Sequence, residues 1–271
     1  MGSFDGSIAF VGAGSMGGAI ARGLVESGVV AASSAAVCDL SADVRARFKA
    51  LGVATFGDAV EMIRDVDPDV VVLAVKPQVL EAAVAPIREL LADRLVVSIA
   101  AGVKVATIEG WLPAGTRVVR CMPNLPMQVR SGAVAITRGT CAATEDVALV
   151  QELLSSLGVA RVMREDQLDV AGVVCGCAPA FFALFVDALT RAGVEAGLPA
   201  ADCREMVEST MCGTAEQLLS SGVHPRAYMD AVSSPGGTTI KALREMEPLL
   251  FESVWSGVDA ALAKTRELAG E

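Results

Sequence analysis

Three glycines near the start of the chain constrain its fold more than any other feature. The apolar run Ile8–Val11 predicts a buried strand, and the pattern G-x-G-x-x-G follows it before an amphipathic stretch over Met16–Ser27. Gly12 allows a tight turn, Gly14 lets a pyrophosphate approach the backbone, and Gly17 lets helix and strand pack closely. A strand, a glycine turn and a helix in this order predict a dinucleotide site, and a purely structural turn is the alternative.

The residue at the end of the next predicted strand bears on the choice of cofactor. Asp39 closes the run Ala36–Asp39, 22 residues after Gly17. A carboxylate there binds the ribose 2′-hydroxyl of NAD and repels a 2′-phosphate, so Asp39 favours NADH over NADPH. The alternative is that Asp39 ends a strand or caps a helix.

Strand and helix signals alternate through the first half of the chain and then change. The predicted strands after Asp39 are Val70–Val75, Arg94–Ile99, Arg117–Cys121, Ala133–Thr137 and Val159–Met163. The predicted helices between them are Ala42–Leu51, Gln78–Leu91 and Thr144–Leu157. This alternation predicts a doubly wound parallel α/β sheet of the Rossmann type. After residue 164 only helices are predicted: Gln167–Gly197, Ala200–Ser221, Arg226–Val232 and Thr239–Ala269. We therefore expect a dinucleotide-binding domain over 1–164 and an all-helical domain over 165–271.

Composition excludes several classes of function. The net charge of −10 gives no long-range attraction to nucleic acid or to an anionic membrane. Apolar runs such as Val70–Val75 are too short to span a bilayer, and the first seven residues show no secretory signal. Seven scattered cysteines fit reduced thiols, so we expect a cytoplasmic protein. With His224 as the single histidine, we expect no metal site.

Two further segments carry candidate binding residues. Lys76 and Pro77 follow a predicted strand, so they emerge at the edge of the sheet where cofactors bind. The segment Ser233–Thr239 is rich in serine, glycine and threonine and precedes a helical run over Ile240–Glu247. Free amides and hydroxyls at a helix start suit a small carboxylate, and an ordinary helix cap is the alternative.

The chain resembles the pyrroline-5-carboxylate reductase family in four blocks that span most of its length. They are Phe10–Gly18, Ala74–Gln78, Arg120–Asn124 and the most specific one, Val232–Ile240. The resemblance implies a Rossmann domain and a helical domain that dimerises, and in this family dimers often assemble into larger rings such as decamers. It implies an active site between the two domains that is completed at the dimer interface.

The resemblance also assigns roles residue by residue. It implies that Gly12, Ala13, Gly14, Ser15, Met16 and Gly17 hold the pyrophosphate. Asn124 and the residues Ala74, Val75, Lys76, Pro77, Ala100 and Ala101 belong to the cofactor site, the last six on its nicotinamide side. The substrate would be held by Ser233, Gly236, Gly237, Thr238 and Thr239. The hydroxyl of Thr239 would hydrogen-bond the ring nitrogen during hydride transfer from NADH or NADPH to the C=N carbon, giving L-proline.

The helical domain departs from the family pattern at one loop. Cys175 and Cys177 stand where the family usually has serines, Ala178 replaces glycine, and Phe181 replaces tyrosine. Thiols are weaker hydrogen-bond partners than hydroxyls, so the pocket is expected to be less polar and the substrate preference to differ. Leu125 replaces a usual threonine after Asn124.

Two other readings stay open on the sequence. One is a related two-domain reductase acting on another cyclic imine or on a hydroxy acid. Hydroxyacid dehydrogenases of this kind typically use a lysine on a helix of the second domain, and Lys241 and Lys264 are the only lysines after residue 165. The other is a non-catalytic NAD(H)-binding paralogue. The sequence alone leaves open NADH against NADPH, a dimer against a larger assembly, and a five-membered against a six-membered ring.

Overall fold

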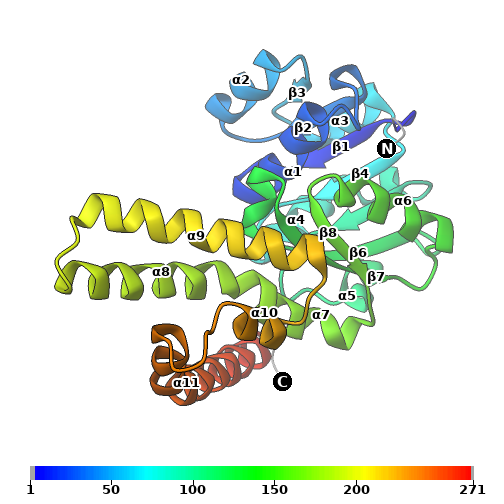
Figure 1. Cartoon of the computed structure of the whole chain (residues 1–271). Coiled ribbons are helices and arrows are strands. Elements are labelled where there is room, and N and C mark those ends of the chain that lie inside the picture. Colours follow the sequence, from blue (N-terminus) through cyan, green and yellow to red (C-terminus); the bar gives the residue numbers. More distant parts are fainter. Residues whose placement is uncertain (1–3, 270–271) are drawn as a thin grey trace. The chain divides into compact units, whose positions relative to one another are not determined.

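The computed structural model describes residues 4–269, and its N-terminal part contains an eight-stranded sheet (Figure 1). The strands lie in the order β3-β2-β1-β4-β5-β6-β7-β8. Their bounds are β1 (Ile8–Val11), β2 (Ala35–Cys38), β3 (Ala54–Phe56), β4 (Val70–Leu73), β5 (Leu95–Ser98), β6 (Arg117–Pro123), β7 (Gly132–Arg138) and β8 (Gly158–Val162). The strand order reverses between β1 and β4, which is where open α/β sheets bind ligands. The predicted doubly wound Rossmann sheet is confirmed.

Helices and short turns connect and follow the strands. The α-helices are α1 (Ser15–Glu26), α2 (Ala42–Ala50), α3 (Ala59–Val66), α4 (Pro77–Val84), α5 (Val105–Trp111), α6 (Thr144–Ser155), α7 (Glu165–Ala171), α8 (Ala178–Glu195), α9 (Ala200–Ser221), α10 (Pro225–Ala231) and α11 (Thr238–Ala269). Three 3-10 helices are η1 (Ala32–Ser34), η2 (Arg88–Leu91) and η3 (Leu125–Val129), and a π-helical turn is η4 (Gly172–Cys177).

Two hydrophobic cores cover the two faces of the sheet. Along β1, Ile8 and Phe10 enter one core, while Ala9 and Val11 enter the other. Helices α1 and α6 contribute to the first core, and α3, α4 and α5 contribute to the second. A strand that is buried on both faces consists of a continuous apolar run, which explains why the short runs at β1, β4 and β5 were recognisable in the sequence.

One pair of neighbouring strands in the sheet is antiparallel. β7 runs antiparallel to β6, whereas the other neighbouring strands are parallel. The chain between β6 and β7 contains only the short helix η3, and parallel neighbours need a longer crossover. The predicted parallel sheet therefore contains one antiparallel pair, β6 and β7.

Two predicted helices are interrupted, and three short elements were not predicted. The predicted helix Gln78–Leu91 is split into α4 and η2 around Pro86, because proline cannot continue a helical ladder. The predicted helix Gln167–Gly197 is divided by the π turn η4. Strand β3 and helices α3 and α5 are three to eight residues long and lack a long periodic signal.

The described residues divide into two compact units. The first ends at Cys177 and also takes in the chain from Leu262 onward, and the second is Ala178–Ala261. In the second unit, α8 and α9 form an antiparallel pair (Figure 1). The predicted domain boundary after residue 164 falls just before α7 and stays a prediction, and the ends of the two predicted ranges, residues 1–3 and 270–271, lie outside the described part.

One helical stretch differs from the expectation that apolar runs are too short to cross a membrane. Glu165–Glu195 spans 31 residues with a mean hydropathy of 2.0 in its most apolar window, and by length and composition alone it could cross a bilayer. Only 11% of that window is buried within the subunit. The stretch therefore exposes a large apolar surface in the isolated subunit. Either a protein partner or a membrane would cover such a surface.

Candidate active site

The first glycine of the motif lies in a turn that other residues could not adopt without strain. Gly12 has a φ of +93°, and its amide donates a hydrogen bond of 2.8 Å to the carbonyl of Cys38 at the end of β2. A Cβ atom at Gly12 would lie 2.9 Å from the carbonyl oxygen of Ala74. The turn that leads from β1 into α1 thus lies directly against the end of β4.

The other two glycines of the motif differ in their surroundings. A Cβ atom at Gly17 would lie 2.5 Å from the carbonyl oxygen of Gly12 and 2.6 Å from the Cβ of Ala74. At Gly14 a Cβ atom would meet no atom within 4 Å. Gly17 therefore serves close packing within the protein, whereas Gly14 leaves its backbone accessible from outside.

Asp39 ties the end of β2 to the glycine turn. Its Oδ2 accepts a hydrogen bond of 2.9 Å from the amide of Ala13, and its Oδ1 accepts one of 2.9 Å from the amide of Ser41. The guanidinium of Arg45 donates to the backbone carbonyls of Asp39 and Leu40 rather than to the carboxylate. Asp39 is partly exposed, so the carboxylate organises the turn and still faces the solvent at the sheet edge.

The remaining predicted cofactor residues follow strands β4, β5 and β6 in the same compact unit. Lys76 is the N-cap of α4 and Pro77 is its first residue, one position before the predicted helix start at Gln78. Ala100 is 3% exposed, whereas Ala101 is exposed. Because the carboxyl ends of parallel strands meet at one edge of a sheet, these loops share that edge with the glycine turn.

Asn124 uses its side chain to join two segments. Its Nδ2 donates a hydrogen bond of 3.1 Å to the carbonyl of Cys175 in η4, and its Oδ1 accepts one of 2.7 Å from the amide of Ala133. The residue is 9% exposed. The structure thus gives Asn124 a tethering function, and its predicted cofactor contact stays a prediction.

A groove lies beside the glycine turn, between α1, α2 and η3. It has a volume of about 490 Å³, and Gly14, Ser15, Arg22 and Arg47 are among its lining residues. The side-chain amide of Gln128 in η3 donates a hydrogen bond of 3.2 Å to Ser15 Oγ across this groove. Two arginines therefore lie near the turn in a chain whose overall charge is negative.

The predicted substrate segment forms a tight turn between α10 and α11. Gly236 has a φ of +68°, and the amide of Gly237 donates a hydrogen bond of 2.9 Å to the carbonyl of Ser234. Thr238 and Thr239 are the first two residues of α11. The first amides of a helix have no partner within the helix, so this turn presents donors next to two hydroxyl groups.

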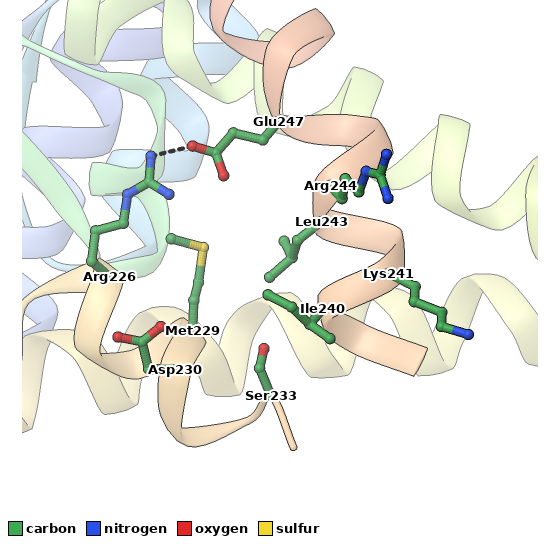
Figure 2. A pocket seen from close by; sticks show the side chains of 9 residues that line it. All are labelled: Arg226, Met229, Asp230, Ser233, Ile240, Lys241, Leu243, Arg244 and Glu247. Atoms are coloured by element: carbon green, nitrogen blue, oxygen red, sulfur yellow. Dashed lines mark hydrogen bonds and ion pairs between the residues drawn. The ribbon is translucent and has the colours of Figure 1, made fainter. Parts of the chain in front are cut away.

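A pocket of about 290 Å³ lies against this turn in the helical unit (Figure 2). Ser233 is the one predicted substrate residue that lines it, and Gly236, Gly237, Thr238 and Thr239 do not. The Oγ atom of Ser233 is buried and has no hydrogen-bond partner among residues 4–269. Figure 2 shows Ser233 beside Ile240, with the pocket between α10 and α11.

Charged groups from both helices surround the pocket. Arg226 Nη2 lies 2.5 Å from Glu247 Oε1 (Figure 2). The same guanidinium lies 5.6 Å from the centre of the Phe251 ring. The hydrogen bond from Arg226 lowers the pKa of the Glu247 carboxyl. Lys241 and Arg244 add two further cations, so the lining carries three cations and the two carboxylates of Asp230 and Glu247.

The thiols of the chain fall into buried and accessible groups. Burial, with the nearby carboxylates of Asp58 and Asp39, raises the pKa of Cys38 to about 11, and burial also raises the pKa of Cys121. Cys175 and Cys177 lie two positions apart in η4 and are half-buried. All seven cysteines are free, and no cluster of three or more metal-binding side chains occurs among the described residues.

Sequence reasoning missed a buried ion network and the function of the single histidine. The side chain of Arg120 is 1% exposed and forms ion pairs of 3.0 Å with both Glu165 and Asp169. A charged residue inside the apolar run of β6 was the available signal, since a buried charge requires partners. His224 caps α10, because its Nδ1 accepts a hydrogen bond from the amide of Arg226.

A doubly wound sheet with a glycine turn at its switch point, followed by a helical unit, defines the class of NAD(P)-dependent two-part oxidoreductases. Comparison with family models agrees: residues 7–102 match the NADP oxidoreductase coenzyme F420-dependent family, and residues 165–268 match pyrroline-5-carboxylate reductase dimerisation. The chain belongs to the pyrroline-5-carboxylate reductase family.

The sequence similarity to curated members of this family extends over nearly the full length of the chain. The chain is 36% identical over 270 residues to pyrroline-5-carboxylate reductase 3 of Macaca fascicularis, covering 99% of this chain and 98% of the relative. It is 35% identical over 267 residues to pyrroline-5-carboxylate reductase of Arabidopsis thaliana, covering 97% of this chain and 95% of the relative.

Solved structures agree with the sequence comparisons. A pyrroline-5-carboxylate reductase from Coxiella burnetii aligns with a TM-score of 0.92 at 31% identity, over 98% of this chain and 99% of the other. The Plasmodium falciparum enzyme, solved with NADP bound, aligns with a TM-score of 0.86 at 26% identity, over 99% and 100% of the two chains.

Proposed function

We propose that this chain reduces 1-pyrroline-5-carboxylate to L-proline with NADH or NADPH. The observation that carries the proposal is the full-length similarity to reductases named for this substrate, at 35–36% identity. The turn Ser233–Thr239, with free helix amides beside two threonines, supplies the local chemistry for a small ring carboxylate.

The glycine turn fits a dinucleotide. The open space above Gly14 would admit a pyrophosphate to the backbone amides at the start of α1. Asp39 lies where a ribose would be bound, and Ala74–Pro77, Ala100, Ala101 and Asn124 line the same sheet edge. The bound cofactor would supply the hydride that adds to the C=N carbon.

The side chains of this protein would orient the imine and exclude water. The hydroxyl of Thr239 can hydrogen-bond the ring nitrogen, and the Gly237–Thr239 backbone can hold the carboxylate. An unperturbed hydroxyl is a poor acid, so we assign Thr239 to orientation rather than to proton donation. An imine is readily protonated before hydride arrives, so the reaction consumes one proton and needs no strong protein acid.

We further propose that NADH is preferred over NADPH. The carboxylate of Asp39 carries a negative charge at the end of β2, and a 2′-phosphate would bring a second anion close to it. Arg45, the nearest cation in the sequence, already binds the backbone carbonyls of Asp39 and Leu40. The Plasmodium falciparum relative was solved with NADP, so the preference is proposed for this chain alone.

We propose that the protein is a cytoplasmic homodimer that assembles further into a larger ring such as a decamer. We propose no membrane or nucleic-acid partner. Phe182, Leu184 and Trp255 are 59%, 68% and 66% exposed in the isolated subunit. They lie within the region that matches the dimerisation domain, which gives the apolar stretch Glu165–Glu195 a protein partner instead of a bilayer.

Steady-state oxidation of NADH and NADPH with racemic pyrroline-5-carboxylate tests the proposal. We expect turnover with this imine, a higher kcat/KM for NADH, and a large loss of kcat/KM in Thr239→Ala. Parallel assays with a six-membered cyclic imine and with hydroxy acids separate the related reductases. Dinucleotide binding by calorimetry without turnover of any of these substrates would instead identify a non-catalytic paralogue.

A further inference from the structure

The buried guanidinium of Arg120 joins strand β6 to helix α7 in the first unit. Arg120 lies in the middle of β6, where its strand neighbours Ser98 and Thr137 are themselves buried. Its Nη1 lies 3.0 Å from Glu165 Oε1, and its Nη2 lies 3.0 Å from Asp169 Oδ1. The two carboxylates are four residues apart in α7, so they project from one face of that helix.

Glu165 extends this network to the loop after β5. Its Oε1 accepts the hydrogen bond from Arg120. The same atom also accepts a hydrogen bond of 2.6 Å from the amide of Val105, the first residue of α5. The loop that ends at Val105 begins after Ser98 and contains Ala100 and Ala101. One carboxylate oxygen therefore connects the centre of the sheet to the end of a loop that the proposed function places at the nicotinamide.

Two further contacts hold the segment after α7 against β6 and the residue that follows it. A Cβ atom at Gly172 would lie 2.8 Å from Met122 Cε, so η4 packs closely on this strand. One turn further, Asn124 donates to the carbonyl of Cys175. Arg120, Met122 and Asn124 thus contact α7 and η4 at three successive points, and the chain then continues into the helical unit at Ala178.

We propose that Arg120 and Glu165 are positioning residues for hydride transfer. In this role they would act through the segments they hold and not by direct contact with cofactor or substrate. They fix the Ile99–Lys104 loop through Val105 and fix α7 on the sheet, so that Ala100, Ala101 and Asn124 keep a single geometry. The inference rests on the proposed function. Because a displacement of about 1 Å at a reacting pair can cost on the order of 100-fold in rate, such a network would affect kcat more than cofactor affinity.

Three variants of α7 test the assignment. Glu165→Ala removes both hydrogen bonds, Glu165→Gln keeps an acceptor oxygen for Val105 and Arg120, and Asp166→Asn alters a surface pair with Arg164 on the same helix turn. We expect Glu165→Ala to lower kcat at least tenfold while the Kd for NADH changes less than threefold. Glu165→Gln should restore most of the kcat, and Asp166→Asn should match the unchanged protein.

Hydrogen exchange supplies a readout that does not depend on turnover. Amides in peptides covering residues 99–106 should exchange faster in Glu165→Ala than in Asp166→Asn, with and without NAD⁺. A kcat of Glu165→Ala equal to that of the unchanged protein, well below its unfolding temperature, would overturn the assignment. An unchanged exchange rate at 99–106 would also overturn it. If the unchanged protein fails to oxidise NADH with pyrroline-5-carboxylate, the proposed function fails, and the exchange experiment still decides the network.

Discussion

Gly14 and Gly17 share one motif but have opposite surroundings, and this contrast yields a matched pair of variants. Gly17→Ala would place a methyl group 2.5 Å from the carbonyl oxygen of Gly12, a backbone atom that cannot rotate away. We expect a loss of about 1–3 kcal/mol in the free energy of unfolding, as overpacking usually costs. Gly14→Ala meets open space, so its stability should change by less than about 0.5 kcal/mol.

The two variants separate packing from binding. Urea denaturation measures the stability of both, and calorimetric titration measures the affinity for NADH. Gly14→Ala should weaken NADH binding despite its intact fold, because the methyl group occupies the space assigned to the pyrophosphate. Full NADH affinity in Gly14→Ala would show that the cofactor does not approach the chain at this residue.

Asp39 has a double function, and an amide at this position tests its negative charge. Asp39→Asn keeps one oxygen that can accept from the amide of Ala13, but it removes the negative charge and the hydrogen bond from the amide of Ser41, because the amide nitrogen cannot accept. We expect the ratio of kcat/KM for NADPH over NADH to rise about tenfold, which corresponds to about 1.4 kcal/mol. Steady-state kinetics with both cofactors measures the ratio, and an unchanged ratio would contradict the preference assigned to this carboxylate.

The turn between α10 and α11 is the element on which substrate binding depends. A Cβ atom at Gly237 would lie 3.0 Å from the carbonyl oxygen of Ser234, the acceptor of the hydrogen bond that closes this turn. Gly237→Ala should therefore open the turn and raise the KM for the imine about tenfold, or about 1.4 kcal/mol, with little change in the Kd for NADH.

A second glycine of the helical unit serves as the control for this variant. Gly213 lies within α9, where a Cβ atom would meet no atom within 4 Å in the subunit. Gly213→Ala should leave both constants unchanged, since alanine is the better helix former. Equal KM values for the imine in the two variants would show that the closed turn does not matter for substrate binding.

Long and strongly patterned elements could be predicted from the sequence, and short ones could not. Helix α9 has the predicted bounds, and β1 does as well, because a long amphipathic run and a fully buried strand each leave a clear pattern. Helices α3 and α5 are eight and seven residues long, too short for a periodic signal, and packing against the sheet stabilises them. The reversal of β7 depends on the length of one connection.

The candidate site was predictable where a motif carries it. Gly12 lies in the turn before α1 and Gly17 lies in the first turn of α1, as their spacing implies, and Ser233 lines a pocket in the helical unit. The network of Arg120, Glu165 and Asp169 could not be predicted, because its members are separated by 45 and 49 residues and form no local pattern. Tethering by Asn124 likewise depends on contacts between distant segments.

The helical unit exposes more apolar surface than a monomer would be expected to leave in water, so assembly is a property of the whole molecule. Leu184 on α8 is 68% exposed, and we propose α8 as the subunit interface, where Leu184→Glu would bury a charge. We expect multi-angle light scattering to show a smaller species for this variant. Val162→Glu, at a residue of β8 that is 49% exposed, should keep the mass of the unchanged protein. A variant Leu184→Glu of unchanged mass would argue against α8 as the interface.

The function of this molecule requires the transfer of a hydride from a reduced nicotinamide to the C=N carbon of pyrroline-5-carboxylate. The most direct measurement supplies NADH deuterated at C4 of the nicotinamide and analyses the amino acid product by mass spectrometry and NMR. We expect one proline per NADH consumed, with deuterium at C5 when the deuterium of NADH lies on the transferred face. Consumption of NADH without proline, or proline with no deuterium at C5 from either C4 epimer, would contradict it.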